Sequence, residues 1–143
     1  MKKQKDLIVP YRLEGRSERY KNIINKKIRD YIKNGSKGDL NLSHTPIESL
    51  PSNLKTVGGD LSLENTKIVT LPDDLTVTGS VFLWGSKFNQ IPKNLQIEEV
   101  LYLSYTPIIK KYRLLEIKNM IEDRGGKVLD LSTSGGGIDD RYY

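Results

Sequence analysis

The sequence predicts an α/β fold in which short parallel strands stack as a solenoid behind an N-terminal capping helix. The segment from Gly38 to Ile108 nearly repeats three times and begins a fourth copy, at a step of 20 or 21 residues. A helical pattern of apolar residues precedes the repeats, and a second one interrupts the fourth copy. Because one such unit cannot bury its apolar side alone, a repeat of this size indicates units that stack on a shared core.

The units align on their apolar positions. They read GDLNLSHTPIESLPSNLKTVG, GDLSLENTKIVTLPDDLTVT, GSVFLWGSKFNQIPKNLQIE and EVLYLSYTPI. The second and third units match every apolar position of the first, which are Leu40, Leu42, Ile47, Leu50, Leu54 and Val57. The opening Leu-x-Leu alternates apolar and polar residues, which predicts a short strand with its leucines turned inward. Consecutive units then place their strands side by side, parallel and about 4.8 Å apart.

Two further positions recur in each unit and predict how the chain turns. A hydroxyl residue follows each predicted strand, at Thr45, Thr66, Ser86 and Thr106. We expect these hydroxyls to bond nearby backbone groups where the chain leaves the strand. Proline follows an inward apolar residue at Pro51, Pro72 and Pro92. Since proline fixes φ and lacks a donor, the return leg is predicted to be extended or irregular rather than helical.

The wording of the first unit, Gly38 to Pro51, resembles the leucine-rich repeat family. The resemblance is to the short bacterial class of about 20 residues per turn, which carries Leu-Pro on its return side. The pattern GDL-x-L-x-x-T-P-I-x-x-LP is also similar to that of small repeat proteins encoded in bacteriophage genomes. The resemblance implies a leucine-rich-repeat solenoid from a phage or a phage-derived region, with hydroxyl residues where most members carry asparagine. A right-handed β-helix, which also stacks short parallel strands, is the alternative architecture.

The first 37 residues contain a predicted basic leader and the capping helix. Residues 1–16 show no helical period. Over residues 17–35, Ser17 is a predicted N-cap and Asn34-Gly35 a predicted stop. The helix between them has an apolar face that we expect to cover the first unit, formed by Tyr20, Ile23, Ile24, Ile28, Tyr31 and Ile32.

The repeat pattern changes after the fourth strand, although residues 38–134 are predicted to form the whole solenoid. Apolar residues recur at helical spacing over about 110–123, so a helix is expected to replace the return leg. Residues 128–132 then copy residues 100–104 after 28 positions, which predicts a fifth strand at the edge. Residues 135–143 are predicted to be a flexible tail.

Charge and cysteine content limit the classes of function. Residues 1–37 hold 12 Lys and Arg against 4 Asp and Glu, a net charge of +8, whereas residues 38–109 hold 4 against 8, a net charge of −4. The absence of cysteine excludes a disulfide scaffold, a thiolate metal site and a cysteine nucleophile. The first apolar run, Leu7 to Val9, is too short for a signal peptide or a span. We therefore expect a cytoplasmic location, that of the host cell if the protein is phage-encoded, and no membrane partner.

The outward residues of the predicted strands form the main candidate site. They make two columns, Asn41, Ser62, Phe82, Tyr102, Asp130 and Ser43, Glu64, Trp84, Ser104, Ser132. Aromatic residues gather in the later units, and such residues are enriched at the centres of binding surfaces. The predicted partner-binding residues are Phe82, Trp84, Tyr102 and Tyr105. The alternatives are that the leader, the tail or a second copy covers them, or that they have no role.

A second candidate site is the basic face of the capping helix. Arg19, Lys26, Arg29 and Lys33 lie opposite its apolar face and would suit a nucleic acid or another polyanion. A solvated face is the alternative. His44, the only histidine, has no acid or nucleophile partner in the pattern, so we expect no enzyme, no metal site and no cofactor.

The function predicted from these patterns is a non-catalytic protein–protein interaction module that binds a bacterial host or phage protein. The outward face of the sheet would be its binding surface, because repeated strands present outward residues that vary without disturbing the core. The alternatives are binding of a nucleic acid or another polyanion through the basic leader and the helix, and self-association as a structural subunit. The oligomeric state is left open.

Overall fold

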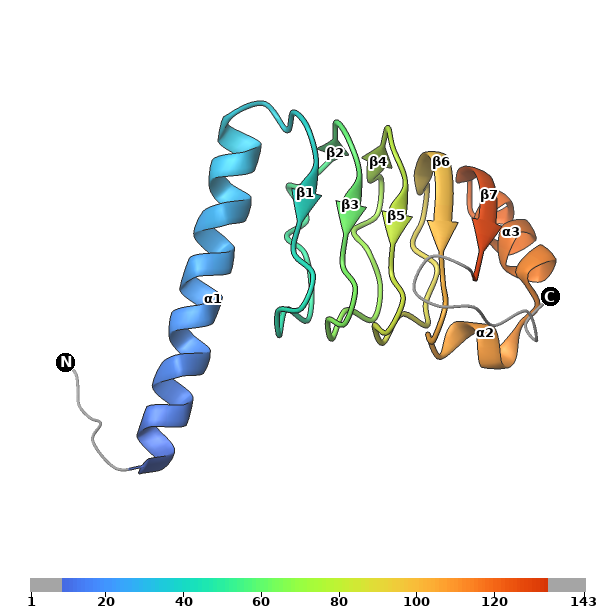
Figure 1. Cartoon of the computed structure of the whole chain (residues 1–143). Coiled ribbons are helices and arrows are strands. Elements are labelled where there is room, and N and C mark those ends of the chain that lie inside the picture. The colour runs from blue at the N-terminus through green and yellow to red at the C-terminus, as the bar shows by residue number, and fades with distance from the viewer. Residues whose placement is uncertain (1–8, 134–143) are drawn as a thin grey trace.

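The computed structural model describes residues 9–133, with side chains from residue 18 onward. The elements follow one another along the molecule in chain order, from a long helix at one end to a helix and strand at the other (Figure 1). They are α1 (Val9–Lys33), β1 (Leu40–Asn41), β2 (Thr56–Val57), β3 (Leu61–Ser62), β4 (Thr76–Val77), β5 (Val81–Phe82), β6 (Gln96–Tyr102), α2 (Ile108–Lys111), α3 (Leu114–Asp123) and β7 (Lys127–Ser132). The predicted α/β class and parallel sheet are confirmed. Residues 1–8 of the predicted leader and the predicted tail lie outside the described residues.

The strands that open the units form one parallel ladder. Leu40 pairs with Leu61, Leu61 with Val81, Val81 with Leu101, and Leu101 with Leu131. All five side chains are buried. The predicted strands, with their apolar residues inward and their neighbours one unit away, are confirmed.

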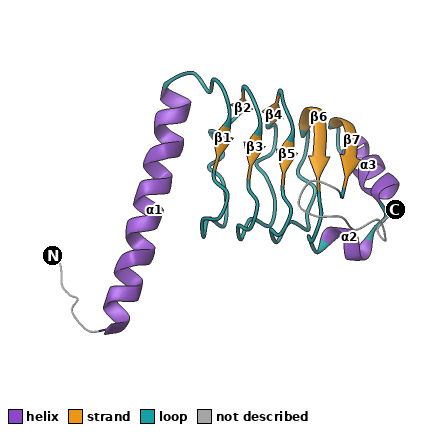
Figure 2. Cartoon of the chain, in the orientation of Figure 1, coloured by secondary structure: helices purple, strands orange, loops and turns teal. Residues whose placement is uncertain are grey.

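The return legs form a second parallel ladder, which the sequence did not specify. Val57 pairs with Val77, Val77 with Ile97, and Ile97 with Val128, and all four are buried. Figure 2 shows β2 and β4 as short strands within long loops, while β6 and β7 are long enough to belong to both ladders. The return leg is therefore extended, as its prolines predicted, and it adds hydrogen bonds to the stack.

The register of the last strand differs from the prediction. A copy after 28 residues would place Asp130 beside Tyr102, but the structure pairs Asp130 with Val100 and pairs Ser132 with Tyr102. The step is thus 30 residues at this point. Ser132, not Asp130, is the fifth member of the outward column that contains Tyr102.

The burial of two apolar residues explains this register. Val128 lies against Ile97 and Leu131 lies against Leu101, so both inward positions of β7 are filled. Leu129, which the copied pattern would turn inward, is 65% exposed. β6 has one more residue between Ile97 and Leu101 than β7 has between their partners, Val128 and Leu131. This extra residue shifts the alignment.

The recurring hydroxyl residues bond the backbone as predicted. Thr45, Thr66 and Thr106 each donate to the carbonyl oxygen three residues earlier, at 2.7, 2.8 and 2.7 Å. Ser86 instead accepts the N–H of Phe88 at 3.3 Å. These bonds satisfy polar groups at the point where each unit turns beneath the core.

A line of side-chain oxygen atoms joins consecutive units just before their first strands. Asp39 Oδ1 accepts the N–H of Asp60 at 2.7 Å, and Asp60 Oδ1 accepts the N–H of Ser80 at 2.8 Å. Ser80 Oγ accepts the N–H of Val100 at 3.1 Å. Each unit thus supplies the acceptor for a backbone donor of the next unit, which fixes their relative position.

Gly59 and Gly79 lie directly against this line of oxygen atoms. A β-carbon on Gly59 would collide with the carboxylate of Asp39, and one on Gly79 would collide with that of Asp60. Either β-carbon would also lie too close to the backbone of the preceding unit. Only glycine allows the units to approach this closely.

Helix α1 begins earlier than predicted. It starts at Val9, so Ser17 lies within the helix and is not its N-cap, and residues 9–16 of the predicted leader are helical. Pro10 falls in the first turn, where the missing N–H would have no helical acceptor. The prediction failed because a proline and Gly15 close together disfavour a helix by local propensity.

The apolar face of α1 covers the first unit only over its C-terminal part. Ile24 and Ile28 are buried, whereas Tyr20 and Ile23 are 52% and 62% exposed. The N-terminal end of α1 leans away from β1 (Figure 1), which explains why Tyr20 and Ile23 are exposed. Tyr31 and Ile32 also pack against the core, so the predicted capping contact is confirmed for four of the six expected residues.

The hydroxyl of Tyr31 ties α1 to both ends of the first unit. It lies 2.7 Å from the carbonyl oxygen of Gly38 and 3.0 Å from that of Ser36, and it accepts the N–H of Gly58 at 3.1 Å. Burial raises the pKa of the Tyr31 phenol, and the charge of Asp39 adds to this effect, while the hydrogen bond from Gly58 opposes it.

The helix predicted over about 110–123 is two helices. The chain is extended at Tyr112, with φ −134° and ψ 149°, and this separates α2 from α3. Glu116 then accepts the backbone N–H of Arg113 at 2.8 Å and caps α3. The inward face of α3 buries Leu114, Ile117 and Ile121.

We expect Asp60→Ala to lower the free energy of unfolding by about 1 to 3 kcal/mol, because the buried N–H of Ser80 loses its acceptor. Asp60→Asn keeps an oxygen acceptor and should cost less. Chemical denaturation measures both, with Glu48→Ala as an exposed carboxylate control that should change stability by less than about 0.5 kcal/mol. A loss no larger than that of the control would contradict the role of this line.

We expect Tyr31→Phe to lower the free energy of unfolding by about 1 kcal/mol near neutral pH, because the phenol hydrogen bonds are lost. A folded-state pKa raised above 10.0 means that this contribution is present below pH 10.0 and is lost as the pH rises through the folded pKa. The difference between wild type and variant should therefore shrink at high pH in denaturation experiments.

Tyr20→Phe, at an exposed position of the same helix, is the matched control and should leave stability unchanged. A difference between wild type and Tyr31→Phe that grows with pH above 10.0 would have the wrong sign for this contact.

Candidate functional site

The sheet register brings two of the four predicted aromatic residues into contact. Phe82 ends β5 and Tyr102 ends β6, and the two are paired in the ladder. Their rings are stacked, with centroids 4.8 Å apart and planes 3° from parallel. This distance equals the usual spacing of neighbouring strands, so the stack follows directly from the register. Both side chains are half-buried.

The other two aromatic residues lie apart from this stack. Trp84 is half-buried, and its ring meets that of His44 edge-on, at a centroid distance of 6.4 Å and an angle of 74°. Tyr105 is 50% exposed. Among the described residues, no ring contact joins Trp84 or Tyr105 to the stack of Phe82 and Tyr102.

The residues that follow the first strands share a left-handed backbone. His44, Asn65, Gly85 and Tyr105 have φ values of 60°, 57°, 76° and 58°. They occupy the same place in their units, which places the four residues in one column beside the outward face. Their alignment was visible in the sequence, but the repeated positive φ was not.

Asn65 contacts residues of both the preceding and the following unit. Its Nδ2 lies 3.2 Å from His44 Nδ1, and its backbone N–H donates to the carbonyl oxygen of Trp84 at 3.0 Å. A β-carbon on Gly85 would collide with the side-chain oxygen of Asn65, so the glycine makes room for it. His44 is thus held on the surface between Asn65 and Trp84, and sequence reasoning missed this cluster.

Glu64 lies in the outward column between Ser43 and Trp84 and is half-buried. Its Oε1 is covered and has no hydrogen-bond donor among the described residues. Sequence reasoning placed Glu64 in the column but gave it no role. The available signal was that Glu64 is the one charged residue among the outward positions of units one to four.

The far end of the outward face is polar. Ser132 stands beside Tyr102, and the buried Ser104 hydroxyl donates to the carbonyl oxygen of Thr133. The hypothesis that the tail covers the aromatic residues concerns residues outside the described part of the chain. Small side chains border the two stacked rings on both sides, namely Ser62 in the preceding strand β3 and Ser132 in the following strand β7.

The predicted basic residues all lie exposed on α1, namely Arg19, Lys26, Arg29 and Lys33. Lys26 forms an ion pair with Asp30 at 2.7 Å. The hydrogen bond from Lys26 holds the pKa of Asp30 below its ordinary value, and the charges of Arg29 and Lys33 act in the same direction. One acidic residue thus interrupts the basic face.

Another lysine of α1 reaches the edge of the sheet. Lys27 Nζ donates to the carbonyl oxygen of Asn41 at 2.6 Å. The basic helix therefore borders the first unit, whereas Phe82 and Tyr102 lie two and three units away from that unit.

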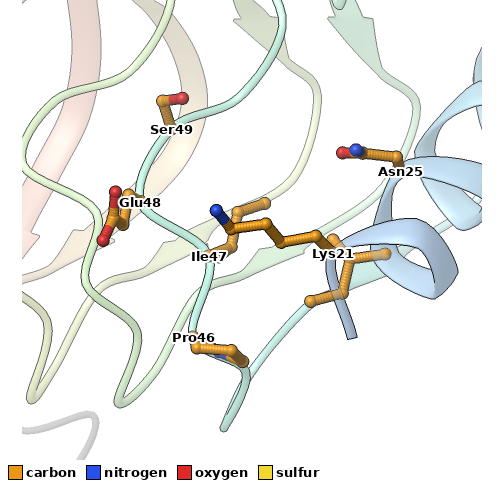
Figure 3. Close-up of a pocket in the computed structure, with 7 residues that line it drawn as sticks. Lys21, Asn25, Pro46, Ile47, Glu48 and Ser49 are labelled. Carbon is orange, nitrogen blue, oxygen red and sulfur yellow. The ribbon is translucent and has the colours of Figure 1, made fainter. Parts of the chain in front are cut away.

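A hollow of about 210 Å³ opens where α1 diverges from the first unit. Figure 3 shows Lys21 extending from the helix toward the segment that carries Ile47 and Glu48. The lining residues are Lys21, Ile24, Asn25, Pro46, Ile47, Glu48 and Ser49. It is a small, mixed surface hollow at the helix junction, on a different part of the molecule from the aromatic stack.

Residues 9–133 contain neither a metal-binding cluster nor a membrane-spanning helix. No group of three or more His, Cys, Asp or Glu side chains there is arranged to hold a metal ion. In the same range, no helix combines the length and the hydropathy needed to cross a membrane.

Comparison of the chain with protein-family models, with curated proteins and with solved structures found no match.

Proposed function

We propose that this protein is a leucine-rich-repeat solenoid that acts as a non-catalytic protein-binding module, with the outward face of its first ladder as the binding surface. The observation that carries the proposal is the half-exposed stack of Phe82 on Tyr102. Aromatic side chains held in one geometry lose little freedom on binding, and they are enriched among residues that dominate binding energy.

The repeat architecture supports this use. Inward leucines fix each unit, so outward residues are presented by a rigid backbone and differ freely between units. The second ladder on the return legs is also compatible with the alternative β-helix. The Leu-Pro return and the two-residue strands β1 to β5 favour the leucine-rich repeat. Either architecture presents the same outward face.

The partner that the sequence resemblance implies is a bacterial host protein or a phage protein. The first test is affinity capture from a bacterial lysate with wild type and with a Phe82→Ala, Trp84→Ala double variant. Removal of a dominant contact costs about 2 kcal/mol or more, a loss of affinity of about 30-fold. We expect wild type to retain a specific protein that the double variant loses.

A matched control is the double variant Tyr20→Ala, Ile23→Ala, which removes two exposed apolar side chains from α1 and leaves the sheet intact. It should capture the same protein as wild type. Equal capture by wild type and by the Phe82, Trp84 variant would show that the aromatic residues are not the binding surface.

Polyanion binding by α1 is a second candidate function, because Arg19, Arg29 and Lys33 are exposed on the side of the helix opposite Ile24 and Ile28. Binding to nucleic acid that weakens steeply with salt and is unaffected by Trp84→Ala would favour this candidate.

A further inference from the structure

One face of the aromatic stack is directed toward the preceding unit. Tyr102 covers one face of Phe82. The opposite face is directed toward the strand below, where the register partner of Phe82 is Ser62. A serine side chain fills little of the space beside an aromatic ring. The outward face therefore steps down from Phe82 to Ser62 across one strand spacing of about 4.8 Å.

A carboxylate borders this step. Glu64 follows Ser62 by two residues and belongs to the same outward face. Glu64 Oε1 has no hydrogen-bond donor, and no ion pair joins Glu64 to a described lysine or arginine. The second carboxylate oxygen of Glu64 is not among the covered atoms, so a ligand can donate to it and bring a positive charge to a carboxylate that no described residue compensates.

A second contact between rings lies over the unit that carries Glu64. His44 belongs to the first unit and Trp84 to the third, yet their centroids are only 6.4 Å apart. Their side chains therefore approach each other across the second unit, which carries Glu64 and Asn65. Asn65 Nδ2, in the following unit, lies 3.2 Å from Nδ1 of the His44 ring, so the His44 side chain is held in place.

A flat, positively charged group matches these features. A guanidinium stacks on an aromatic face and also donates paired hydrogen bonds to a carboxylate. An ammonium is not planar, and a neutral ring offers no charge to Glu64. The net charge of −4 over residues 38–109 also attracts a basic partner and repels an acidic one.

We propose that the step formed by Ser62, Glu64 and Phe82 binds an arginine side chain of the partner protein. The guanidinium stacks on the face of Phe82 that is directed toward Ser62 and donates to the carboxylate of Glu64. This inference rests on the protein-binding function proposed above, and it specifies the chemistry of the partner as a basic segment with an exposed arginine.

The test uses N-acetylargininamide as the probe, in a titration followed by the backbone amide signals of the ¹⁵N-labelled full chain. We expect saturable shifts centred on Ser62, Glu64 and Phe82. N-Acetyllysinamide should bind several-fold more weakly, because it lacks the planar group. N-Acetylcitrullinamide has the same shape without the charge and should give no saturable shift.

Two substitutions separate stacking from charge. Ser62→Phe extends the aromatic stack into the step and should abolish binding, while the core is untouched because Ser62 faces outward. Glu64→Gln keeps the shape and should weaken binding about tenfold, since a charge-assisted hydrogen bond is replaced by a neutral one. Glu48→Gln, at an exposed carboxylate outside the sheet, is the matched control and should bind as wild type does.

The inference is overturned if wild type shows no saturable shift at these residues, or if Glu64→Gln binds arginine as well as Glu48→Gln does. Equal binding of the arginine and citrulline probes would also overturn it, because the site would then read shape without charge. If lysate capture still depends on Phe82 and Trp84 in those cases, the arginine site alone is wrong. If capture is independent of them, the proposed function fails with it.

Discussion

The constraint on which the structure depends is the parallel register between consecutive units. Leu61 lies beside Leu40 on one side and Val81 on the other, so a shift of one residue would turn the apolar side chains of a whole unit to solvent. Polar contacts hold the same register, because Asp60 accepts a backbone donor from the next unit and Gly79 lets the backbones approach. Apolar burial and hydrogen bonding therefore specify one arrangement, as expected for a sequence with a single stable fold.

This register also determines what the molecule presents to solvent. The 4.8 Å separation of the Phe82 and Tyr102 rings is the separation of their strands. Aromatic side chains occur in units three and four, while Asn41 and Ser62 precede them, so the outward face changes from small to large between two neighbouring strands. That change directs one face of Phe82 toward Ser62 and places Glu64 beside it. Because the backbone is fixed by the core, this surface is preorganised for binding.

Much of the fold was predictable from the sequence, because period and alternation are local properties. Leu40 and its counterparts were assigned inward, and the column of Phe82 and Tyr102 followed from the alignment. The register of β7 was not predictable by copying, since the burial of Leu131 and the extra residue in β6 act only in three dimensions. The site was predictable only in part. The role of Glu64 depends on side chains from neighbouring units, and the left-handed backbone that brings Asn65 to His44 has no unique sequence signal.

The arrangement of the outward column is the central claim, since both proposals depend on it. It is tested most directly by nuclear Overhauser effects in the full chain, measured between ring protons and between backbone amides. The sheet register predicts contacts between the rings of Phe82 and Tyr102, together with amide contacts between the strands of Leu61 and Val81. Contacts from the Phe82 ring to the core methyl groups of Leu83 or Ile91, without contacts to Tyr102, would contradict it.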